Sequence, residues 1–367
     1  MKEILMAIGF SKEMGGAQKV FITTINELSN KNCNITVILP DNSLKSLIKS
    51  NKVIIHIINL NSIFSIFEIF KLIRNKNFDV INTYLTKASL LISFTNLFIR
   101  KTIYCTLLNA IIHEKLNFTQ KIVYPKMYYL LSQMCNGFIL NSEQNKLHFL
   151  NTIRIKNNFI KVIYSGIDTN DFKHDNNISY NHNKFNKIII GYVGRLSIEK
   201  GTFYLLEALS QLHDVNFECL ILGDGPERLN LEKYVKNKNL TDKITFLGYQ
   251  QNVYKFLNLM NILVVPSINE TFGLTIVEAF ALKKAVIATN VGGIPEIIEN
   301  DVTGILIPPK NSLLLSEKIR LLNNNTDLIN YFGNNGYNHF IKNFTSIIMA
   351  ENTYEFIIQK TDLKSIF

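Results

Sequence analysis

Short apolar runs rich in β-branched residues alternate with longer amphipathic stretches along the whole chain. Continuous apolar runs are typical of strands buried on both faces of a parallel sheet, and the amphipathic stretches between them are typical of crossover helices. The pattern predicts strands at residues 4–8, 35–39, 53–57, 79–82, 102–106, 137–140 and 159–163, and again at 188–193, 217–222, 244–247, 262–265, 285–288 and 304–307. The clearest helices are expected at residues 16–29, 119–134 and 203–212. The sequence therefore predicts an α/β protein built from βαβ units.

The alternation stops between residues 169 and 187, which are rich in Asn, Asp, His and Lys and carry almost no periodic apolar position. Such a segment is expected to be a solvated linker between an N-terminal domain, residues 1–168, and a second domain that begins at residue 188. With 367 residues, 47% of them hydrophobic, the chain is large enough to bury two cores. In open parallel sheets ligands bind beyond the carboxyl ends of the strands, so functional residues are expected in the loops that follow each strand.

The composition argues against several classes of protein. The four cysteines lie far apart without a C-x-x-C pair, so neither a zinc site nor a disulfide framework is indicated. No apolar run reaches the roughly 18 residues of a transmembrane helix. The first residues show neither the basic region nor the cleavage site of a signal peptide, so a cytoplasmic protein is expected.

The formal net charge of +10 is distributed unevenly. Residues 1–168 hold 20 Lys and Arg against 9 Asp and Glu, and the remainder holds 19 against 20, so the two parts carry +11 and −1. The asymmetry favours an anionic partner for the first part, either a membrane surface or an acidic acceptor, and a lysine-rich solvated surface is the alternative. Nucleic acid is disfavoured because no basic helix with interleaved aromatic residues accompanies the charge.

The predicted strand 188–193 is followed by the segment GRLSIEKG, residues 194–201, and then by a helix. Gly194 leaves the backbone room to turn, and Arg195 and Lys200 place two cations at the head of a helix whose N-terminus itself favours anions. This arrangement suits a diphosphate, although a solvated basic loop is the alternative for any single Arg and Lys. The next strand leads into GDGPE, residues 223–227, where a structural turn is expected with Pro226 at the first helical position.

The strand 262–265 is followed by PSINETFGLTIVEA, residues 266–279. Glu270 falls in the loop, and Gly273 permits close backbone approach where a helix begins. The backbone N–H groups of Leu274 and Thr275 are then donors at a helix N-terminus, suited to phosphate oxygens. Glu278 is expected about two turns into that helix, where its carboxylate can accept hydrogen bonds from two ribose hydroxyls. For either glutamate alone, capping or surface roles are alternatives.

In this order and spacing, these motifs resemble family 4 of the retaining glycosyltransferases, often called group 1. The resemblance covers the whole C-terminal domain and continues through GGIPE, residues 292–296, and GILIP, residues 304–308. It implies the GT-B fold, in which two Rossmann-like parallel-sheet domains face each other across a cleft. Residues 1–168 would bind the acceptor, residues 188–345 the nucleotide sugar, and residues 346–367 would form a helix that crosses back onto the N-terminal domain.

The resemblance also implies roles for the matched residues. Arg195 and Lys200 contact the donor diphosphate, Glu278 the ribose and Glu270 the donor sugar, and Gly15 and Gly16 lie in a glycine loop near the donor phosphate. Many members have Thr-x-His after the fifth strand, where this chain has TLLN, residues 106–109. Asn109 would fill that space, or His113 would reach back to it, and an exposed loop histidine is the alternative.

The resemblance implies retaining, metal-independent transfer of a hexose or N-acetylhexosamine from a nucleotide-diphosphate sugar, with UDP as the first candidate, to a hydroxyl of a lipid-linked, lipopolysaccharide or capsule glycan. We expect neither a metal nor a cofactor, since the chain has no Asp-x-Asp motif and the two cations can stabilise the leaving group. A cytoplasmic protein at the inner face of the membrane is expected, with residues 63–76 and 113–127 as candidate contacts. The apolar stripe in residues 63–76 is alternatively part of the core. A noncatalytic nucleotide-sugar-binding partner subunit, a nucleotide-sugar epimerase and a phosphorylase remain alternatives.

Overall fold

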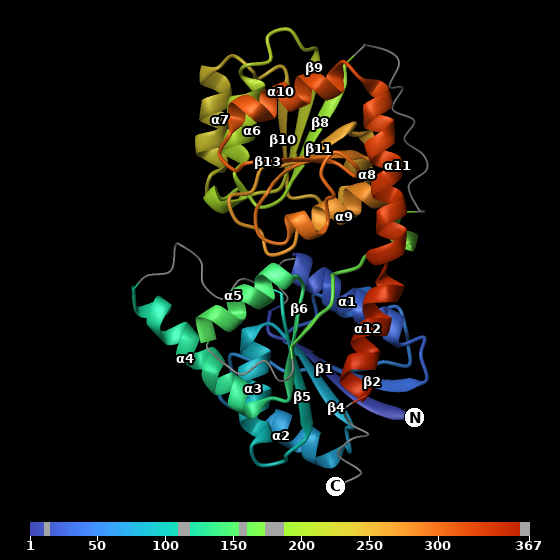
Figure 1. Ribbon diagram of the computed structural model, residues 1–367. Coiled ribbons are helices and arrows are strands. Elements are labelled where there is room, and N and C mark those ends of the chain that lie inside the picture. Colours follow the sequence, from blue (N-terminus) through green and yellow to red (C-terminus); the bar gives the residue numbers. More distant parts are fainter. Residues whose placement is uncertain (11–14, 109–117, 154–159, 173–186, 360–367) are drawn as a thin grey trace. The chain divides into compact units, whose positions relative to one another are not determined.

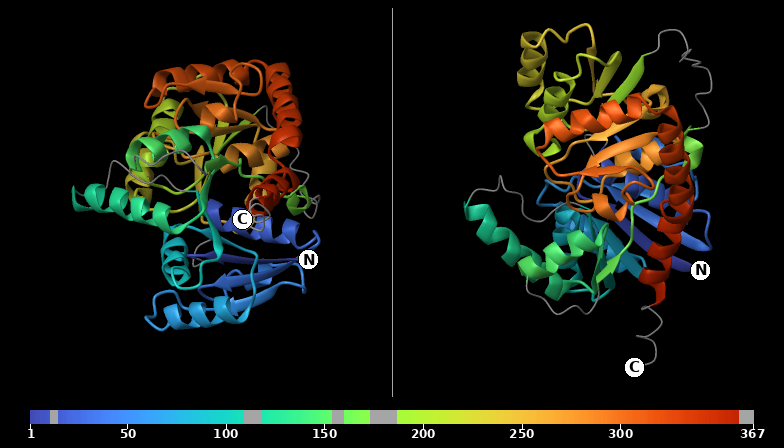
Figure 2. Two further views of the ribbon diagram at one scale, coloured as in Figure 1. Left: turned by 60° about the horizontal axis from the view of Figure 1, so that its bottom comes forward. Right: turned by 45° about the horizontal axis from the view of Figure 1, so that its top comes forward.

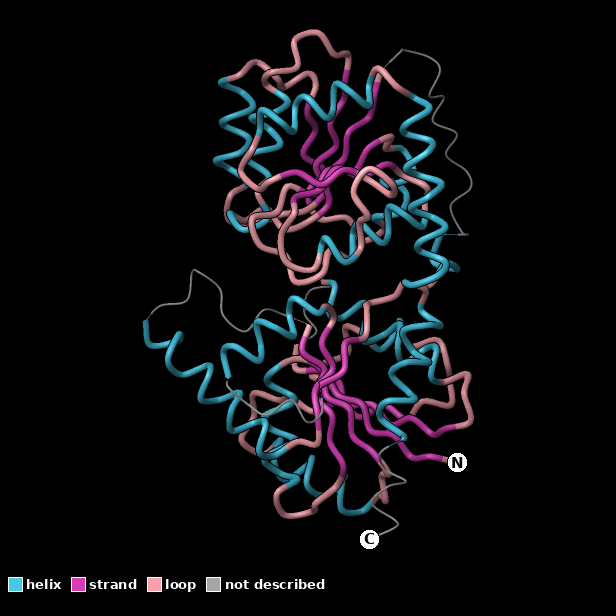
Figure 3. The backbone as a smooth tube through the Cα atoms, viewed as in Figure 1, coloured by secondary structure: helices cyan, strands magenta, loops and turns pink. Residues whose placement is uncertain are grey.

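The computed structural model describes residues 1–10, 15–108, 118–153, 160–172 and 187–359. The chain divides into two compact units, one made of residues 1–167 and the C-terminal helix, the other of residues 168–345. Each unit is built around one parallel sheet with helices on both faces (Figures 1 and 3). The α/β class and the two Rossmann-like sheets predicted from the sequence are confirmed.

The first unit contains a seven-stranded sheet in the order β3-β2-β1-β4-β5-β6-β7. Its strands are β1 (Lys2–Ile8), β2 (Cys33–Leu39), β3 (Ile54–Ile57), β4 (Val80–Tyr84), β5 (Thr102–Leu107), β6 (Gly137–Leu140) and β7 (Ile160–Val162). Its helices are α1 (Gly16–Leu28), α2 (Ser65–Asn75), α3 (Thr86–Asn96), α4 (Phe118–Met134), α5 (Glu143–Ile153) and α12 (Ser346–Gln359), with a short 3-10 turn η1 (Lys45–Leu47). One hydrophobic core lies between the sheet and helices α2 to α5.

Helix α12 follows the second unit in sequence but packs on α1 within the first unit (Figure 2). The Ser346 hydroxyl donates to the Glu27 carboxylate at 2.5 Å, at the start of the helix. One turn further on, the Met349 sulfur lies 3.1 Å from the Gly166 amide nitrogen. Near its end, the Phe356 ring lies 5.1 Å from the Tyr104 ring. The helix is therefore part of the N-terminal unit's packing.

The second unit contains a six-stranded sheet in the order β10-β9-β8-β11-β12-β13. Its strands are β8 (Ile188–Val193), β9 (Phe217–Leu222), β10 (Ile244–Gly248), β11 (Ile262–Val265), β12 (Ala285–Thr289) and β13 (Ile305–Ile307). Its helices are α6 (Thr202–Leu209), α7 (Arg228–Asn237), α8 (Val253–Leu259), α9 (Leu274–Ala281), α10 (Ser312–Asn323) and α11 (Thr326–Asn343), with 3-10 turns η2 (Thr169–Phe172), η4 (Ile198–Lys200) and η5 (Ile294–Glu296). Most of the expected linker, residues 173–186, lies outside the described residues.

The strand order decides where a ligand site can form. The chain builds outward from β8 through β9 to β10, then returns to the other side of β8 with β11. The loops after β8 and β11 therefore diverge from adjacent strands, which is the topological switch point where doubly wound sheets bind nucleotides. The two segments in which the sequence analysis placed the charged candidate residues, 194–201 and 266–279, follow these two strands.

Among the described residues, no helix has the length and apolarity that a membrane span requires. The exposed side of α2 is nevertheless apolar at its start, where Phe64 and Phe67 are 68% and 74% exposed. The same helix buries Ile69 and Ile73 completely. The segment 63–76 thus combines a core face with an outer face that carries aromatic side chains.

Candidate active site

The loop after β8 is fixed by the neighbouring turn. The Leu196 amide donates to the Asp224 carbonyl at 2.9 Å, and the Glu227 amide donates to the Leu196 carbonyl at 3.0 Å. Gly225 lies against Leu196 so closely that a Cβ there would come within 2.8 Å of its carbonyl carbon. The glycine-rich turn therefore has the structural role expected of it, because it supports the backbone that carries Arg195.

One detail of that turn was predicted wrongly. Pro226 is not the first residue of a helix, because α7 begins at Arg228. Glu227, the single residue between them, belongs to the turn that bonds Leu196, so the helix starts only after it. The Gly225 amide and the Arg228 guanidinium both donate to Asp224, each at 2.7 Å, and together they hold the pKa of that carboxyl below its usual value.

The loop after β11 is attached to the loop after β8 through backbone hydrogen bonds. The amides of Ile268 and Asn269 donate to the Glu199 carbonyl at 2.8 Å and 3.2 Å. The Glu199 carboxylate in turn accepts the Ser197 hydroxyl at 2.7 Å. Because Glu199 immediately precedes Lys200 and Asn269 precedes Glu270, these bonds bring the two charged side chains to the same place.

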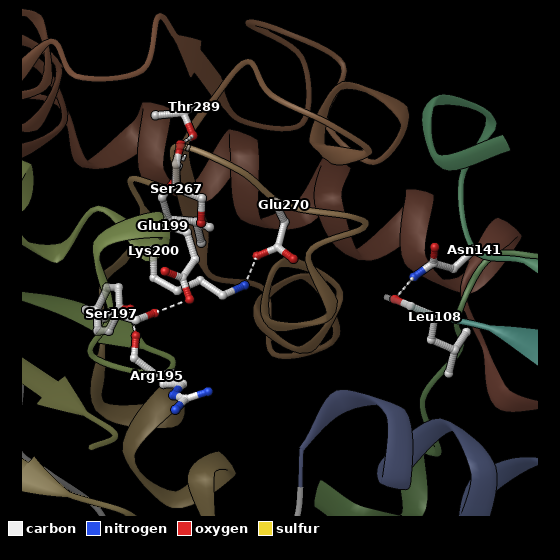
Figure 4. A network of polar contacts seen from close by, with 11 residues as sticks. Leu108, Asn141, Arg195, Ser197, Glu199, Lys200, Ser267, Glu270 and Thr289 are labelled. Carbon is white, nitrogen blue, oxygen red and sulfur yellow. Dashed lines mark hydrogen bonds and ion pairs between the residues drawn. The ribbon is translucent and has the colours of Figure 1, made fainter. Parts of the chain in front are cut away.

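Lys200 and Glu270 form an ion pair across the switch point. The Lys200 Nζ lies 2.5 Å from the Glu270 Oε2, and the two side chains are 29% and 14% exposed. Figure 4 shows the pair together with the Arg195 side chain, which leaves the same loop as Lys200 and is exposed to solvent. An ammonium group has three donors, so Lys200 can keep its bond to Glu270 and still contact an anion. The structure thus joins two residues that the sequence assigned to different parts of a donor.

The start of α9 supplies the predicted helix N-terminus. Gly273 precedes the helix in a left-handed conformation, with φ of +108°, and Leu274 and Thr275 form its first two positions. The N–H groups of a first helical turn have no acceptor within the helix and suit an anion. Glu278 is 4% exposed and is the fifth helical residue, just over one turn from the start. It was expected about two turns in, but in a helix that starts at Leu274, as predicted, the fifth residue lies only just over one turn along.

In the N-terminal unit, Gly15 caps α1 and Gly16 is the first residue of that helix. The Gly15 amide donates to the Gln18 side-chain oxygen at 3.2 Å, and the Gln18 side-chain amide donates to the Phe10 carbonyl at 3.3 Å. Gln18 therefore ties both ends of the glycine loop, of which residues 11–14 are not described. Gln18 was not identified from the sequence, although a polar residue three positions after a helix cap is a known capping signal.

The predicted acceptor-side residues Asn109 and His113 lie outside the described residues. The backbone just before them is held by Asn141, which was not singled out from the sequence. Asn141 is 4% exposed, donates to the Leu108 carbonyl at 3.3 Å and accepts the Asn145 side-chain amide at 3.0 Å. It lies directly after β6, at the carboxyl end of a strand, where functional residues were expected, but that position alone does not distinguish it from other polar residues there.

Comparisons with known proteins identify the family. A family model described as glycosyl transferases group 1 matches residues 175–339, and one described as glycosyltransferase family 4 matches residues 14–171. Alpha-D-kanosaminyltransferase of Streptomyces kanamyceticus is 32% identical over 144 residues, which cover 38% of this chain and 37% of that protein. N-acetyl-alpha-D-glucosaminyl L-malate synthase of Bacillus anthracis is 34% identical over 155 residues, covering 41% and 40%. The matches thus span less than half the length of these two relatives.

Solved structures extend the likeness to the whole fold. Anabaena Alr3699/HepE in complex with UDP and glucose superimposes with a TM-score of 0.83 at 21% identity, covering 96% of this chain and 98% of that one. WaaG, a glycosyltransferase involved in lipopolysaccharide biosynthesis, superimposes with a TM-score of 0.70 at 14% identity, covering 97% and 99%. At these identities the likeness concerns the fold. With two family models that together match most of its length, the chain belongs to the group 1 glycosyltransferases of family 4.

Proposed function

We propose that this protein is a retaining glycosyltransferase that takes a hexose or N-acetylhexosamine from a UDP-sugar, without a metal ion. The observation that carries the proposal is the meeting of Lys200 and Glu270 at the switch point of the second sheet, beside the N-terminus of α9. The choice of UDP is supported by the HepE complexes with UDP and with UDP-glucose.

The proposed mechanism follows from where charge develops. When the bond between the anomeric carbon and the β-phosphate oxygen breaks, the leaving diphosphate gains negative charge. Arg195, Lys200 and the α9 N-terminus would stabilise that charge more in the transition state than in the ground state. The acceptor hydroxyl would attack the same face of the sugar and pass its proton to the departing phosphate oxygen. Glu270 would orient the sugar, and Glu278 would hold the ribose.

The acceptor in this proposal is a hydroxyl of a lipid-linked, lipopolysaccharide or capsule glycan. Support comes from the names of relatives, among them the capsular polysaccharide biosynthesis glycosyltransferase CapM of Staphylococcus aureus, 27% identical over 236 residues covering 60% of this chain and 61% of that protein. The O-antigen biosynthesis glycosyltransferase WclY of Escherichia coli is 29% identical over 177 residues, covering 44% and 49%.

The proposal includes peripheral contact of the N-terminal unit with an anionic membrane. The support is the outer face of α2, where the exposed Phe64 and Phe67 are followed by the exposed Lys71 and Arg74 one and two turns later. Aromatic and basic side chains on one helix face can bind an interface by combining apolar burial with attraction to anionic lipid. The +11 charge of residues 1–168 acts in the same direction.

The decisive test is UDP release from UDP-glucose, measured with and without added glycan acceptors. We expect Lys200→Ala and Arg195→Ala each to reduce kcat/KM by roughly 100-fold, the usual effect of removing a group that stabilises transition-state charge. Lys236→Ala is the matched control, because this exposed lysine lies in the last turn of α7, outside the loops after β8 and β11. Near-normal rates in both site variants would refute the donor assignment.

Two other outcomes separate the alternatives. Binding of UDP-glucose without turnover across all acceptors would indicate a noncatalytic subunit. Conversion of UDP-glucose to an epimeric UDP-sugar in the absence of any acceptor would indicate an epimerase.

A further inference from the structure

The loop that carries Glu270 is held at its start by a side-chain hydrogen bond from the strand next to β11. Thr289 is the last residue of β12, and its hydroxyl donates to the Ser267 carbonyl at 2.6 Å and lies 3.4 Å from the Val265 carbonyl. Figure 4 shows this contact together with the Lys200–Glu270 pair. Ser267 lies three residues before Glu270, so the bond holds the start of the loop after β11.

The position of Thr289 explains why a side chain is needed there. β11 and β12 pair in register up to Val265 and Ala288, where the ladder between them ends. On its other side β12 stays paired with β13 through Thr289 and Ile307, and the Asn290 amide donates to the Ile307 carbonyl at 2.8 Å. Beyond the last paired residues, the hydrogen bond from the Thr289 hydroxyl to the Ser267 carbonyl is therefore what still joins β12 to the loop after β11.

The burial of Thr289 argues that its hydroxyl is required. The residue is 2% exposed, and its neighbours Val265 and Ala288 are also buried. Valine has the same branched shape and needs no hydrogen-bond partner, and a buried hydroxyl is costly unless it is bonded. The Thr289 hydroxyl gives the buried Ser267 carbonyl a hydrogen-bond donor that valine could not supply, so threonine is favoured at this position.

Backbone hydrogen bonds hold the later part of the same loop. The Glu199 carbonyl holds Ile268 and Asn269, and the Gly293 amide donates to the Glu270 carbonyl at 3.2 Å. These bonds fix the far part of the loop, whereas Thr289 fixes its start. We propose that Thr289 is a positioning residue for the transfer reaction, whose hydroxyl orients the loop so that the Glu270 carboxylate meets Lys200.

The test compares Thr289→Val, which removes the hydroxyl and keeps the shape, with Thr289→Ser, which keeps the hydroxyl. For UDP release from UDP-glucose we expect the valine variant to lose about tenfold in kcat/KM, the effect of one buried hydrogen bond. The serine variant should remain within about twofold of the wild type. The loss should fall on kcat more than on UDP affinity, because Glu270 is assigned to the sugar and not to the nucleotide.

A double-mutant cycle with Glu270→Gln separates positioning from general stability. If Thr289 acts through Glu270, Thr289→Val should cost less than about twofold in the Glu270→Gln background. Thr303→Val is the matched control, because Thr303 is a 3% exposed threonine of the same unit whose hydroxyl is bonded within residues 299–303. It should lower the unfolding temperature without changing kcat/KM. An undiminished loss in the Glu270→Gln background, or an equal loss in Thr303→Val, would overturn the proposal.

The expected effect on turnover rests on the proposed function. The crystal structures of the variants provide a second test that does not depend on it. Crystal structures of Thr289→Val and Thr289→Ser should show the Lys200–Glu270 pair broken, beyond about 4 Å, in the first and intact in the second. A pair that stays intact in Thr289→Val would reject the positioning role, even if wild-type protein turned over no UDP-sugar. Conversely, an inactive wild type with a broken pair in the valine variant would reject the donor assignment and keep the positioning role.

Discussion

A substitution at Gly292 tests the site directly, because the Gly292 backbone packs closely against the Glu270 carbonyl group. Its φ is +54°, in the left-handed region that side chains disfavour. A Cβ at this position would overlap the Glu270 carbonyl oxygen and lie 2.8 Å from the carbonyl carbon, whereas ordinary contacts begin at 3.4 Å. Because the overlapping oxygen has to move beyond about 3.0 Å, Gly292→Ala must displace Glu270 or its own loop by more than about 1 Å.

The expected magnitude follows from that displacement. A misplacement of about 1 Å near reacting groups can cost roughly 100-fold in rate, so we expect Gly292→Ala to reduce kcat/KM for the UDP-sugar by about 10- to 100-fold. The left-handed backbone adds a folding cost of roughly 1–2 kcal/mol for a non-glycine residue. In a unit of this size, that cost lowers the unfolding temperature by roughly 2–8 °C.

The assay is UDP release from UDP-glucose at a temperature well below the unfolding midpoint, with the midpoint measured by circular dichroism. Gly248→Ala is the control, because Gly248 has φ of +67° but a Cβ there would meet only the flexible end of the Arg228 side chain, at 3.2 Å. It should lose similar stability and stay within about threefold of wild-type activity. Equal activity losses in both variants, or a folded and fully active Gly292→Ala, would refute the steric argument.

Three further outcomes are expected. Glu278→Gln should weaken UDP binding by about 10- to 100-fold in calorimetry, because a charged acceptor for the ribose becomes neutral, and unchanged affinity would contradict the ribose role. Phe64→Ser combined with Phe67→Ser should weaken sedimentation with anionic vesicles about tenfold or more, whereas Leu313→Ser, a change at a 61% exposed position on α10, should not. Burial lowers the pKa of His339 below 6.5, so the unfolded chain binds more protons there and stability should fall as the pH drops below about 6.5. In denaturant titrations across this pH range His339→Gln should flatten that slope, and an unchanged slope would exclude His339 as its source.

The strands could be predicted from sequence because each carries its signal locally. Runs such as residues 188–193 and 262–265 are apolar throughout, as strands covered on both faces must be, and they became β8 and β11 with the same bounds. Helix starts were less exact. Pro226 precedes α7 by two residues because Leu196, from another strand's loop, bonds the turn between them.

The candidate site was only partly predictable. Arg195, Lys200, Glu270 and Glu278 could be singled out because their order and spacing lie in two continuous segments of the chain. Thr289 and Asn141 could not, because each acts by bonding a carbonyl in another segment, at Ser267 and Leu108. Nothing near either residue in the sequence distinguishes it from other polar residues after a strand.

By itself, then, the sequence determined the elements, the two sheets and the chemical types available at the carboxyl ends of the second sheet. Only the tertiary structure decided that Lys200 and Glu270, 70 residues apart, form a pair. The reason is the strand order: β8 and β11 are neighbours only because the chain reverses direction across the sheet after β10. Local propensity specifies each strand, but which strands become neighbours depends on how the strands and crossover helices pack. The site forms only because that packing places β8 beside β11.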